Sequence, residues 1–149
     1  MYNRIVVGVD GSALSDAALR QALELARLSG GTITAVTVTE PSTMVMPALD
    51  MVAVDTTNLY QELEKAHATM AEKVLEQARA VAGTTAIGAV HLPGRHTADG
   101  ILDAAEMAGA DLIVMGSHGR RGLGRLLLGS QAAEVLSRSK VPVLIVKQA

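Results

Sequence analysis

Residues 5–12 read Ile-Val-Val-Gly-Val-Asp-Gly-Ser, a short apolar run that ends in an acidic residue and a turn. Such a run is typical of a strand buried on both faces of a parallel sheet. Ser12 is a residue type that caps helix N-termini, and apolar residues then recur at spacings of three and four from Leu14 to Leu28. Ser29-Gly30-Gly31 is a stop signal for that helix. The chain therefore opens with a strand that leads directly into a helix.

The same order of elements recurs along the chain. Further strands are predicted at 32–38, 84–92, 112–115 and 142–146, and further helices at 58–82, 97–108 and 130–139. The clearest helix, 58–82, carries one apolar stripe from Leu59 to Val81. Alternating strands and helices predict a single α/β domain, residues 1–149, with an open five-stranded parallel sheet and helices on both faces. Residues 39–57 show no clear period and are expected to form an irregular or mobile connecting segment.

Composition narrows the class of protein. The chain has 149 residues, of which 49% are hydrophobic, and a formal net charge of −2, which disfavours nucleic acid as the main partner. Phe and Trp are absent, so the aromatic platforms that stack single-stranded bases are missing. The absence of cysteine excludes disulfides and thiol chemistry, and no apolar run approaches the roughly 18 residues of a membrane span. We expect a cytoplasmic protein with no membrane partner.

Glycines and a serine are concentrated after the strand predicted at 112–115. Gly116-Ser117-His118-Gly119 is followed by nine residues and then by Gly129-Ser130. Glycine allows close approach of the backbone to a ligand, and the start of a helix favours phosphate. In open α/β sheets ligands bind beyond the carboxyl ends of the strands, which is where these residues are expected. The pattern indicates a phosphate site, with ordinary turn glycines as the alternative interpretation.

Three segments, 5–12, 111–119 and 141–147, resemble signatures of the universal stress protein family in the order found there. The spacing of Gly116, Gly119 and Gly129-Ser130 resembles the pattern of the ATP-binding branch, and the resemblance covers essentially the whole chain. It implies a Rossmann-like fold of the adenine nucleotide alpha hydrolase type. It also implies a homodimer that pairs through the last strand, which would otherwise be an exposed apolar sheet edge.

The resemblance implies roles for residues at the ends of the first two strands and in the glycine loop. Asp10 would face the nucleoside and help to hold a divalent ion, Mg²⁺, and Val38 would meet adenine through its backbone. Met115 would lie against the ribose. Gly116 and Gly119 would lie beside the ribose and the α-phosphate.

The phosphate end would be formed by Gly129 and Ser130, which the resemblance places against the β- and γ-phosphates. Arg120, Arg121 and Arg125 lie in the nine-residue spacer and are candidate phosphate contacts, or else part of a solvated basic surface.

One segment departs from the family pattern. The family usually has Gly-x-Pro after the third strand, but residues 94–97 read Gly-Arg-His-Thr, and Gly100 is expected to interrupt the helix start.

Three functions remain open from the sequence. The first is an ATP-binding regulatory or stress-response protein with slow or incidental hydrolysis. The second is a true ATPase or phosphotransferase, and the third is a scaffold dimer that binds no nucleotide. No acidic residue lies between Gly116 and Gly129 to orient water, and His118 has no obvious catalytic partner, so no catalytic residue is predicted.

Overall fold

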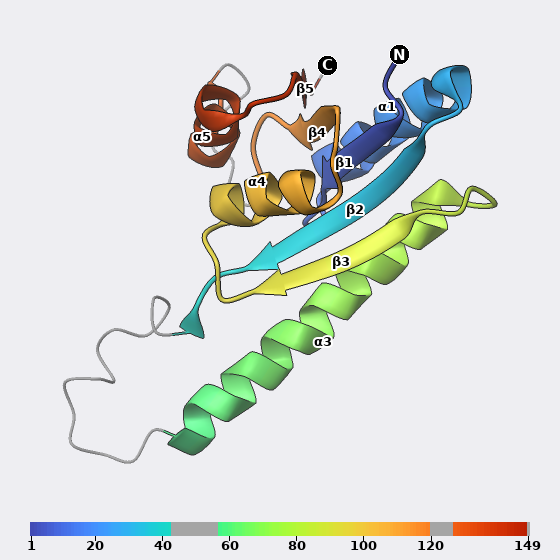
Figure 1. Cartoon of the computed structure of the whole chain (residues 1–149). Coiled ribbons are helices and arrows are strands. Elements are labelled where there is room, and N and C mark those ends of the chain that lie inside the picture. Colours follow the sequence, from blue (N-terminus) through green and yellow to red (C-terminus); the bar gives the residue numbers. More distant parts are fainter. Residues whose placement is uncertain (43–56, 120–126, 149) are drawn as a thin grey trace.

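The computed structural model of the chain describes residues 1–42, 57–119 and 127–148, and it confirms the alternation of strands and helices (Figure 1). In chain order the elements are β1 (Arg4–Gly8), α1 (Ala13–Ser29), β2 (Thr32–Thr39), α3 (Thr57–Ala82), β3 (Gly88–Pro93), α4 (Thr97–Met107), β4 (Leu112–Gly116), α5 (Ser130–Arg138) and β5 (Val143–Val146). Most of the segment 39–57 lies outside the described residues.

The five strands form one parallel sheet in the order β3-β2-β1-β4-β5. The chain first builds outward from β1 to β3, then returns to the other side of β1 to add β4 and β5. Strand order therefore reverses between β1 and β4. In open α/β sheets, this reversal point is where ligands bind, beyond the carboxyl ends of the strands.

Helices cover both faces of the sheet, as predicted. Alternate side chains of β1 point to opposite faces, so Ile5 and Val7 belong to one core and Val6 to the other. The first core packs against α1 and α3, and the second packs against α4 and α5 (Figure 1). Both cores are built from Ala, Val, Leu, Ile and Met, consistent with a chain that has no Phe or Trp.

The predicted start and stop signals of helix α1 are confirmed. The Oγ of Ser12 accepts a hydrogen bond from the backbone N–H of Ser15 at 3.1 Å, which caps the start of the helix. Gly30 ends the helix in the left-handed conformation, with φ of 72°, and its N–H donates to the carbonyl of Ala26. These two caps fix where β1 ends and where β2 can begin.

Two predictions from the sequence are wrong: which apolar residues of α1 and α3 are buried, and where β3 begins. Leu28 is 78% exposed, and the buried face of α3 is Ala71, Leu75, Ala78 and Ala82 rather than the predicted stripe from Leu59. The N-terminal half of α3 projects past the strand ends and has no sheet to cover (Figure 1). Residues 84–87 are not part of a strand, so β3 begins at Gly88.

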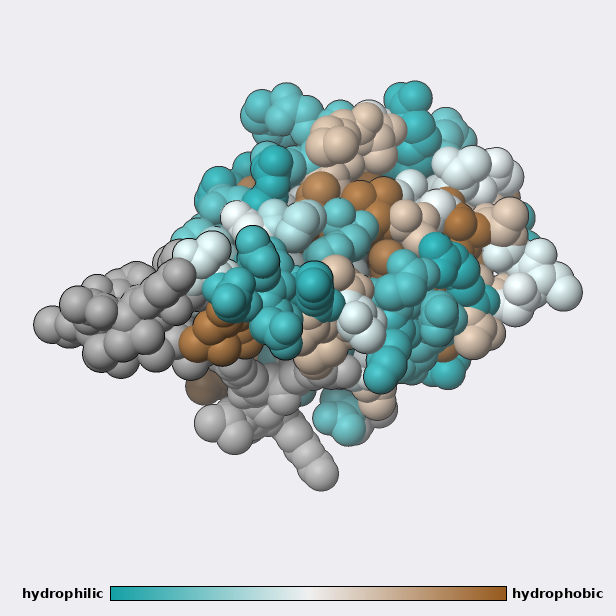
Figure 2. Space-filling model, turned by 90° about the horizontal axis from the view of Figure 1, so that it is seen from below, coloured by the Kyte–Doolittle hydropathy of each residue, from teal (hydrophilic) through white to brown (hydrophobic). Residues whose placement is uncertain are grey.

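The outer face of α3 is polar. Its charged side chains, Glu62, Glu64, Lys65, Glu72, Lys73, Glu76 and Arg79, belong to exposed residues. Seen from below, the side on which α3 lies, the described surface is largely hydrophilic with small apolar areas between (Figure 2). None of the helices in the described ranges combines the length and the apolar character that crossing a bilayer requires.

Candidate functional site

A cavity of about 560 Å³ opens at the strand-order reversal, beyond the carboxyl ends of β1, β2 and β4. Its size falls within the range of small-molecule sites. The structure brings seven of the predicted site residues together around it, namely Asp10, Val38, Met115, Gly116, Gly119, Gly129 and Ser130. Arg120, Arg121 and Arg125 lie outside the described residues.

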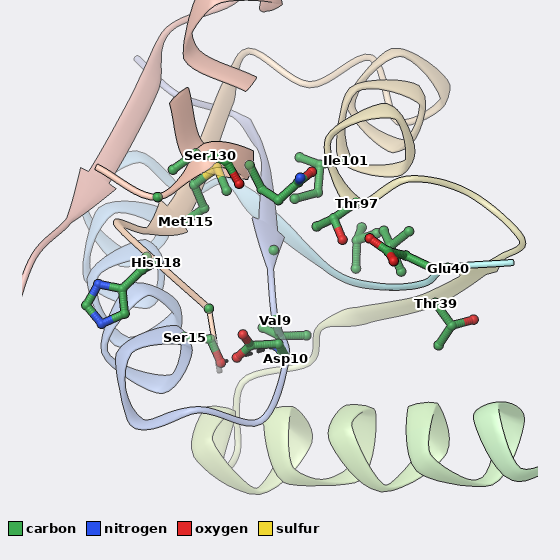
Figure 3. Close-up of a pocket in the computed structure, with 18 of the residues that line it drawn as sticks. Val9, Asp10, Ser15, Thr39, Glu40, Thr97, Ile101, Met115, His118 and Ser130 are labelled. Carbon is green, nitrogen blue, oxygen red and sulfur yellow. Dashed lines mark hydrogen bonds between the residues drawn. The ribbon is translucent and has the colours of Figure 1, made fainter. Parts of the chain in front are cut away.

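Asp10 follows β1, and its two carboxylate oxygens face different parts of the protein. Its Oδ1 accepts a hydrogen bond from the N–H of Ser12 at 2.9 Å, which fixes the turn into α1. Its other oxygen, Oδ2, lies so close to Gly119 that a Cβ built there would be 2.8 Å away. Figure 3 shows the Asp10 side chain at the wall of the pocket. The carboxylate therefore caps the turn and also faces the glycine loop.

Gly116 and Gly129 are glycines because parts of the protein itself approach them closely. A Cβ on Gly129 would lie 2.8 Å from the carbonyl oxygen of Ser117 and 3.1 Å from the Cα of His118. A Cβ on Gly116 would lie 2.9 Å from the Cγ of Leu14. The φ angle of Gly129 is −61°, so left-handed backbone is not the reason. Packing against Leu14 of α1 at Gly116, and against residues 117–118 at Gly129, explains these glycines without any ligand.

Ser117 joins the glycine loop to the last strand. Its carbonyl accepts from the N–H of Gly129 at 2.6 Å, and its own N–H donates to the carbonyl of Val146 at 2.8 Å. Ser117 is buried at 6% exposure. Backbone hydrogen bonds of Ser117 thus link the start of α5 to the end of β5.

The first turn of α5 borders the pocket with backbone donors. Its N-cap, Gly129, provides no side-chain hydrogen bond, and no acidic residue lies in that turn. The first N–H groups of a helix lack partners within the helix, and the helix dipole makes this end positive. Ser130, an exposed residue, adds a hydroxyl at the same place. This end of the pocket suits an anionic group.

A second helix start faces the same cavity. Thr97, the first residue of α4, lines the pocket beside residues of α5 (Figure 3). The N–H of Ala98 donates to the Oε1 of Gln131 at 2.9 Å, so a side chain of α5 caps α4. His96, the N-cap of α4, makes no side-chain capping bond. The starts of two helices therefore border one cavity, although the first turn of α4 contains an acidic residue, Asp99, which pairs with Arg138 at 2.8 Å.

The opposite side of the pocket has an apolar part, which depends on Gly100, next to the polar residues Thr39, Glu40 and His67. The prediction that this glycine interrupts the helix start is wrong, because it lies buried inside α4. A Cβ on Gly100 would lie 2.6 and 2.7 Å from the two γ-methyl groups of Val38. Gly100 thus allows α4 to pack directly against the end of β2. Ile101 approaches Gly8 in the same way, and both residues line the pocket.

A group of polar residues at the β2–β3 end was not predicted. His91 shares a 2.8 Å hydrogen bond between its Nε2 and the Oγ1 of Thr39. Burial lowers the pKa of His91, although the nearby carboxylate of Glu64 opposes that shift. His67 lines the pocket, and its buried Nδ1 has no hydrogen-bond partner among the described residues. No sequence signal joins these residues, because they lie far apart on β2, α3 and β3.

The described part of the glycine loop contains one histidine, His118, and no cluster of metal ligands. The ring of His118 is turned away from Asp10 and Ser130 (Figure 3), and its Nδ1 lies 3.3 Å from the Oγ of Ser117. Within the described ranges, no group of three or more His, Asp or Glu side chains is placed to hold a metal. A divalent ion here would combine Asp10 with oxygens of a ligand, an arrangement that Mg²⁺ commonly adopts with phosphates.

Comparison with known proteins adds to this geometry. The universal stress protein MJ0531 of Methanocaldococcus jannaschii is 34% identical over 148 residues, covering 99% of this chain and 84% of that protein. The structure of UspA from Lactobacillus plantarum shares the fold, with a TM-score of 0.80, 24% identity and coverage of 98% of each chain. A universal stress protein solved in complex with cAMP is 30% identical, with a TM-score of 0.70 and coverage of 99% of each chain.

The family model described as "Universal stress protein family" matches residues 1–147, almost the entire chain. The fold, the order of the signature segments and the full-length relatives agree with that match. The chain therefore belongs to the universal stress protein family.

Proposed function

We propose that this protein binds ATP in the cavity at the strand-order reversal and acts as a nucleotide-dependent regulatory protein in a stress response. One observation carries the proposal: the cavity has an apolar part beside β2, where Val38 and Ile101 lie, and the positive start of α5 at its other end. An adenine nucleotide has the same two-part character, with an apolar base and an anionic tail. The structure of a relative in complex with cAMP supports an adenine nucleotide as the ligand class.

In this arrangement adenine lies beside Val38, and the ribose lies between Met115 and the glycine loop. Gly116 and Gly119 border the ribose and the α-phosphate. The β- and γ-phosphates receive hydrogen bonds from the first-turn amides of α5 and from the Ser130 hydroxyl. Gly129 contributes by holding α5 against Ser117, so that these amides face the phosphates. Arg120, Arg121 and Arg125, which belong to the nine-residue spacer between Gly119 and Gly129, are proposed to neutralise phosphate charge.

Mg²⁺ is proposed to accompany ATP. Asp10 supplies one hard carboxylate oxygen, and the phosphates supply the others, since Mg²⁺ is usually bound by one or two carboxylates together with substrate phosphates. The ion would offset the repulsion between the Asp10 carboxylate and the triphosphate.

Hydrolysis is proposed to be slow or incidental. Efficient phosphoryl transfer needs a residue that orients the attacking nucleophile, in addition to positioned phosphates and a metal. His118 is turned away from the phosphate end (Figure 3), and the spacer between Gly116 and Gly129 contains no acidic residue. We expect a turnover rate far below the roughly 10 s⁻¹ of a typical enzyme.

We further propose that two copies pair through β5 and that the protein acts in the cytoplasm, apart from nucleic acid and membranes. β5 is an edge strand, and its residues Val143–Val146 are apolar and only partly buried. Unpaired apolar edges favour pairing with another chain. Sedimentation of the purified protein should give twice the mass of one chain, whereas a monomer at all concentrations would contradict this part of the proposal.

The proposal is tested by identifying what the protein carries. Protein purified without added nucleotide is denatured, and the released small molecules are identified by mass spectrometry. We expect an adenine nucleotide in an amount that approaches one per chain. The same protein stripped of ligand should regain its melting temperature when ATP and Mg²⁺ are added. Release of no nucleotide, together with a melting curve that millimolar ATP leaves unchanged, would reject the function.

A further inference from the structure

Gln131 is a polar side chain in the pocket with no role in the glycine pattern. It follows Ser130 in the first turn of α5, is partly buried and lines the cavity. Its Oε1 accepts a hydrogen bond from the backbone N–H of Ala98, 33 residues away, at 2.9 Å. The side chain thus spans from the start of α5 to the start of α4.

That hydrogen bond fixes which way round the amide group lies. A backbone N–H can only donate, so the atom that receives it must be the oxygen of Gln131 and not the nitrogen. This hydrogen bond therefore uses neither of the two N–H donors of Nε2. Among the residues that the structure describes, no acceptor is bonded to it. Partly buried donors at the wall of a cavity are the groups that a ligand would satisfy.

The surroundings of Nε2 favour an anionic acceptor. Gln131 shares the positive first turn of α5 with Ser130, and it also touches the first turn of α4. Asp99, the acidic residue in that turn of α4, is paired with Arg138 at 2.8 Å. Neither the first turn of α5 nor the residue before it carries a carboxylate. Phosphate oxygens are the acceptors that this combination of amides, hydroxyl and helix ends fits.

We propose that Gln131 is a ligand contact: its Nε2 donates to a phosphate oxygen of the bound nucleotide while its Oε1 holds the start of α4. This inference rests on the nucleotide-binding function proposed above. The same α4 carries Gly100, which packs on Val38 at the opposite wall. Gln131 therefore connects the phosphate end of the site with the wall on which the base lies.

The two ends of the side chain can be tested separately. Gln131→Glu keeps an oxygen for the Ala98 N–H but replaces the two donors with a carboxylate oxygen. Gln131→Ala removes both ends. Gln61→Glu is the matched control, because it adds the same charge at an exposed position of α3 that does not line the pocket.

The measurements are the melting temperature without nucleotide and the affinities for ATP with Mg²⁺ and for adenosine by calorimetry. For Gln131→Glu we expect an unchanged or slightly raised melting temperature, because a carboxylate at a helix start is favourable. Its ATP affinity should fall at least tenfold, while its adenosine affinity stays within twofold of the wild type. Gln131→Ala should melt at a lower temperature and also bind ATP more weakly. Gln61→Glu should bind both ligands like the wild type.

The outcomes separate this inference from the proposed function. Wild-type protein that binds ATP, together with a Gln131→Glu variant that binds it equally well, would overturn the phosphate contact alone. Equal weakening of ATP and adenosine would also overturn it, since the side chain would then act only on pocket shape. Wild-type protein that binds neither ligand would reject the proposed function and this inference together.

Discussion

Gly129→Ala should destabilise the protein even when no nucleotide is present. The new Cβ would lie 2.8 Å from the carbonyl oxygen of Ser117 and 3.1 Å from the Cα of His118, and both are backbone atoms that cannot rotate away. Relieving this contact requires the start of α5 to shift. The shift would strain the 2.6 Å hydrogen bond from the Gly129 N–H to Ser117.

The size of the effect follows from the kind of contact. Overpacking of this type costs about 1–3 kcal/mol, and alanine is a poorer N-cap than glycine by less than about 1 kcal/mol. Reduced freedom of the unfolded chain returns about 0.4–1 kcal/mol. The free energy of unfolding should therefore fall by about 1–3 kcal/mol, which lowers the melting temperature by roughly 3–10 °C for a domain of this size.

Gly119→Ala is the matched comparison. Among the residues that the structure describes, its Cβ would meet only the end of the Asp10 side chain, with Oδ2 at 2.8 Å, and a carboxylate can rotate. We expect a stability loss below about 1 kcal/mol, but weaker ATP binding, because Asp10 would have to move. Urea unfolding of ligand-free protein, followed by circular dichroism, measures both variants. The reasoning is refuted if Gly129→Ala unfolds like the wild type, or if Gly119→Ala is the less stable of the two.

Three further predictions follow from single contacts. Ser130→Ala should weaken ATP binding about tenfold by calorimetry, since hydrogen bonds to charged groups contribute about 1.5–3 kcal/mol. Ser137→Ala is the control, because the Ser137 hydroxyl donates to the carbonyl of Glu134 on the exposed side of α5, and this variant should bind ATP like the wild type. Burial lowers the pKa of His91, so stability is full above about pH 6.5 and is lost as the pH falls through the lowered value. The loss of unfolding free energy between pH 7 and pH 5 should therefore be smaller for His91→Gln, and an equal loss would contradict the assignment. Hydrogen bonds from the N–H groups of Asn3 and Arg4 lower the pKa of Asp111, so this carboxylate stabilises the fold above about pH 4 and less as the pH falls through its pKa. Asp111→Asn should be less stable than the wild type at pH 7, and the difference in unfolding free energy should become smaller as the pH is lowered in acid unfolding experiments. A difference that does not change with pH would contradict the stabilising role of the Asp111 carboxylate.

The sequence predicted the fold because its local signals agree with one another. Ser12 and Gly30 cap α1 where the pattern required caps, and the apolar runs of β1 and β4 are central strands with buried faces. The predicted site residues gather around one cavity for a topological reason. Asp10, Val38 and Met115 lie at the carboxyl ends of three neighbouring parallel strands, and parallel strands end at the same edge of their sheet.

What the sequence missed depends on distances between distant segments. The nearness of Gly129 to Ser117 and of Gly100 to Val38 follows from how loops and helices pack, so the glycines were attributed to the ligand or to a helix interruption. Gln131 reaches Ala98 across 33 residues, a separation that no local pattern encodes. The stripe on α3 was overextended because periodicity does not reveal where the sheet beneath a helix ends.

Titration calorimetry of nucleotide-free wild-type protein with ATP and Mg²⁺ tests the central claim, that the cavity between β1, β2, β4 and α5 is a nucleotide site. We predict one ATP per chain with a micromolar dissociation constant, or about −8 kcal/mol. Adenosine, which lacks the phosphates that the start of α5 would bind, should bind more weakly. The absence of binding heat at millimolar ATP, with a melting temperature that ATP does not raise, would contradict the claim.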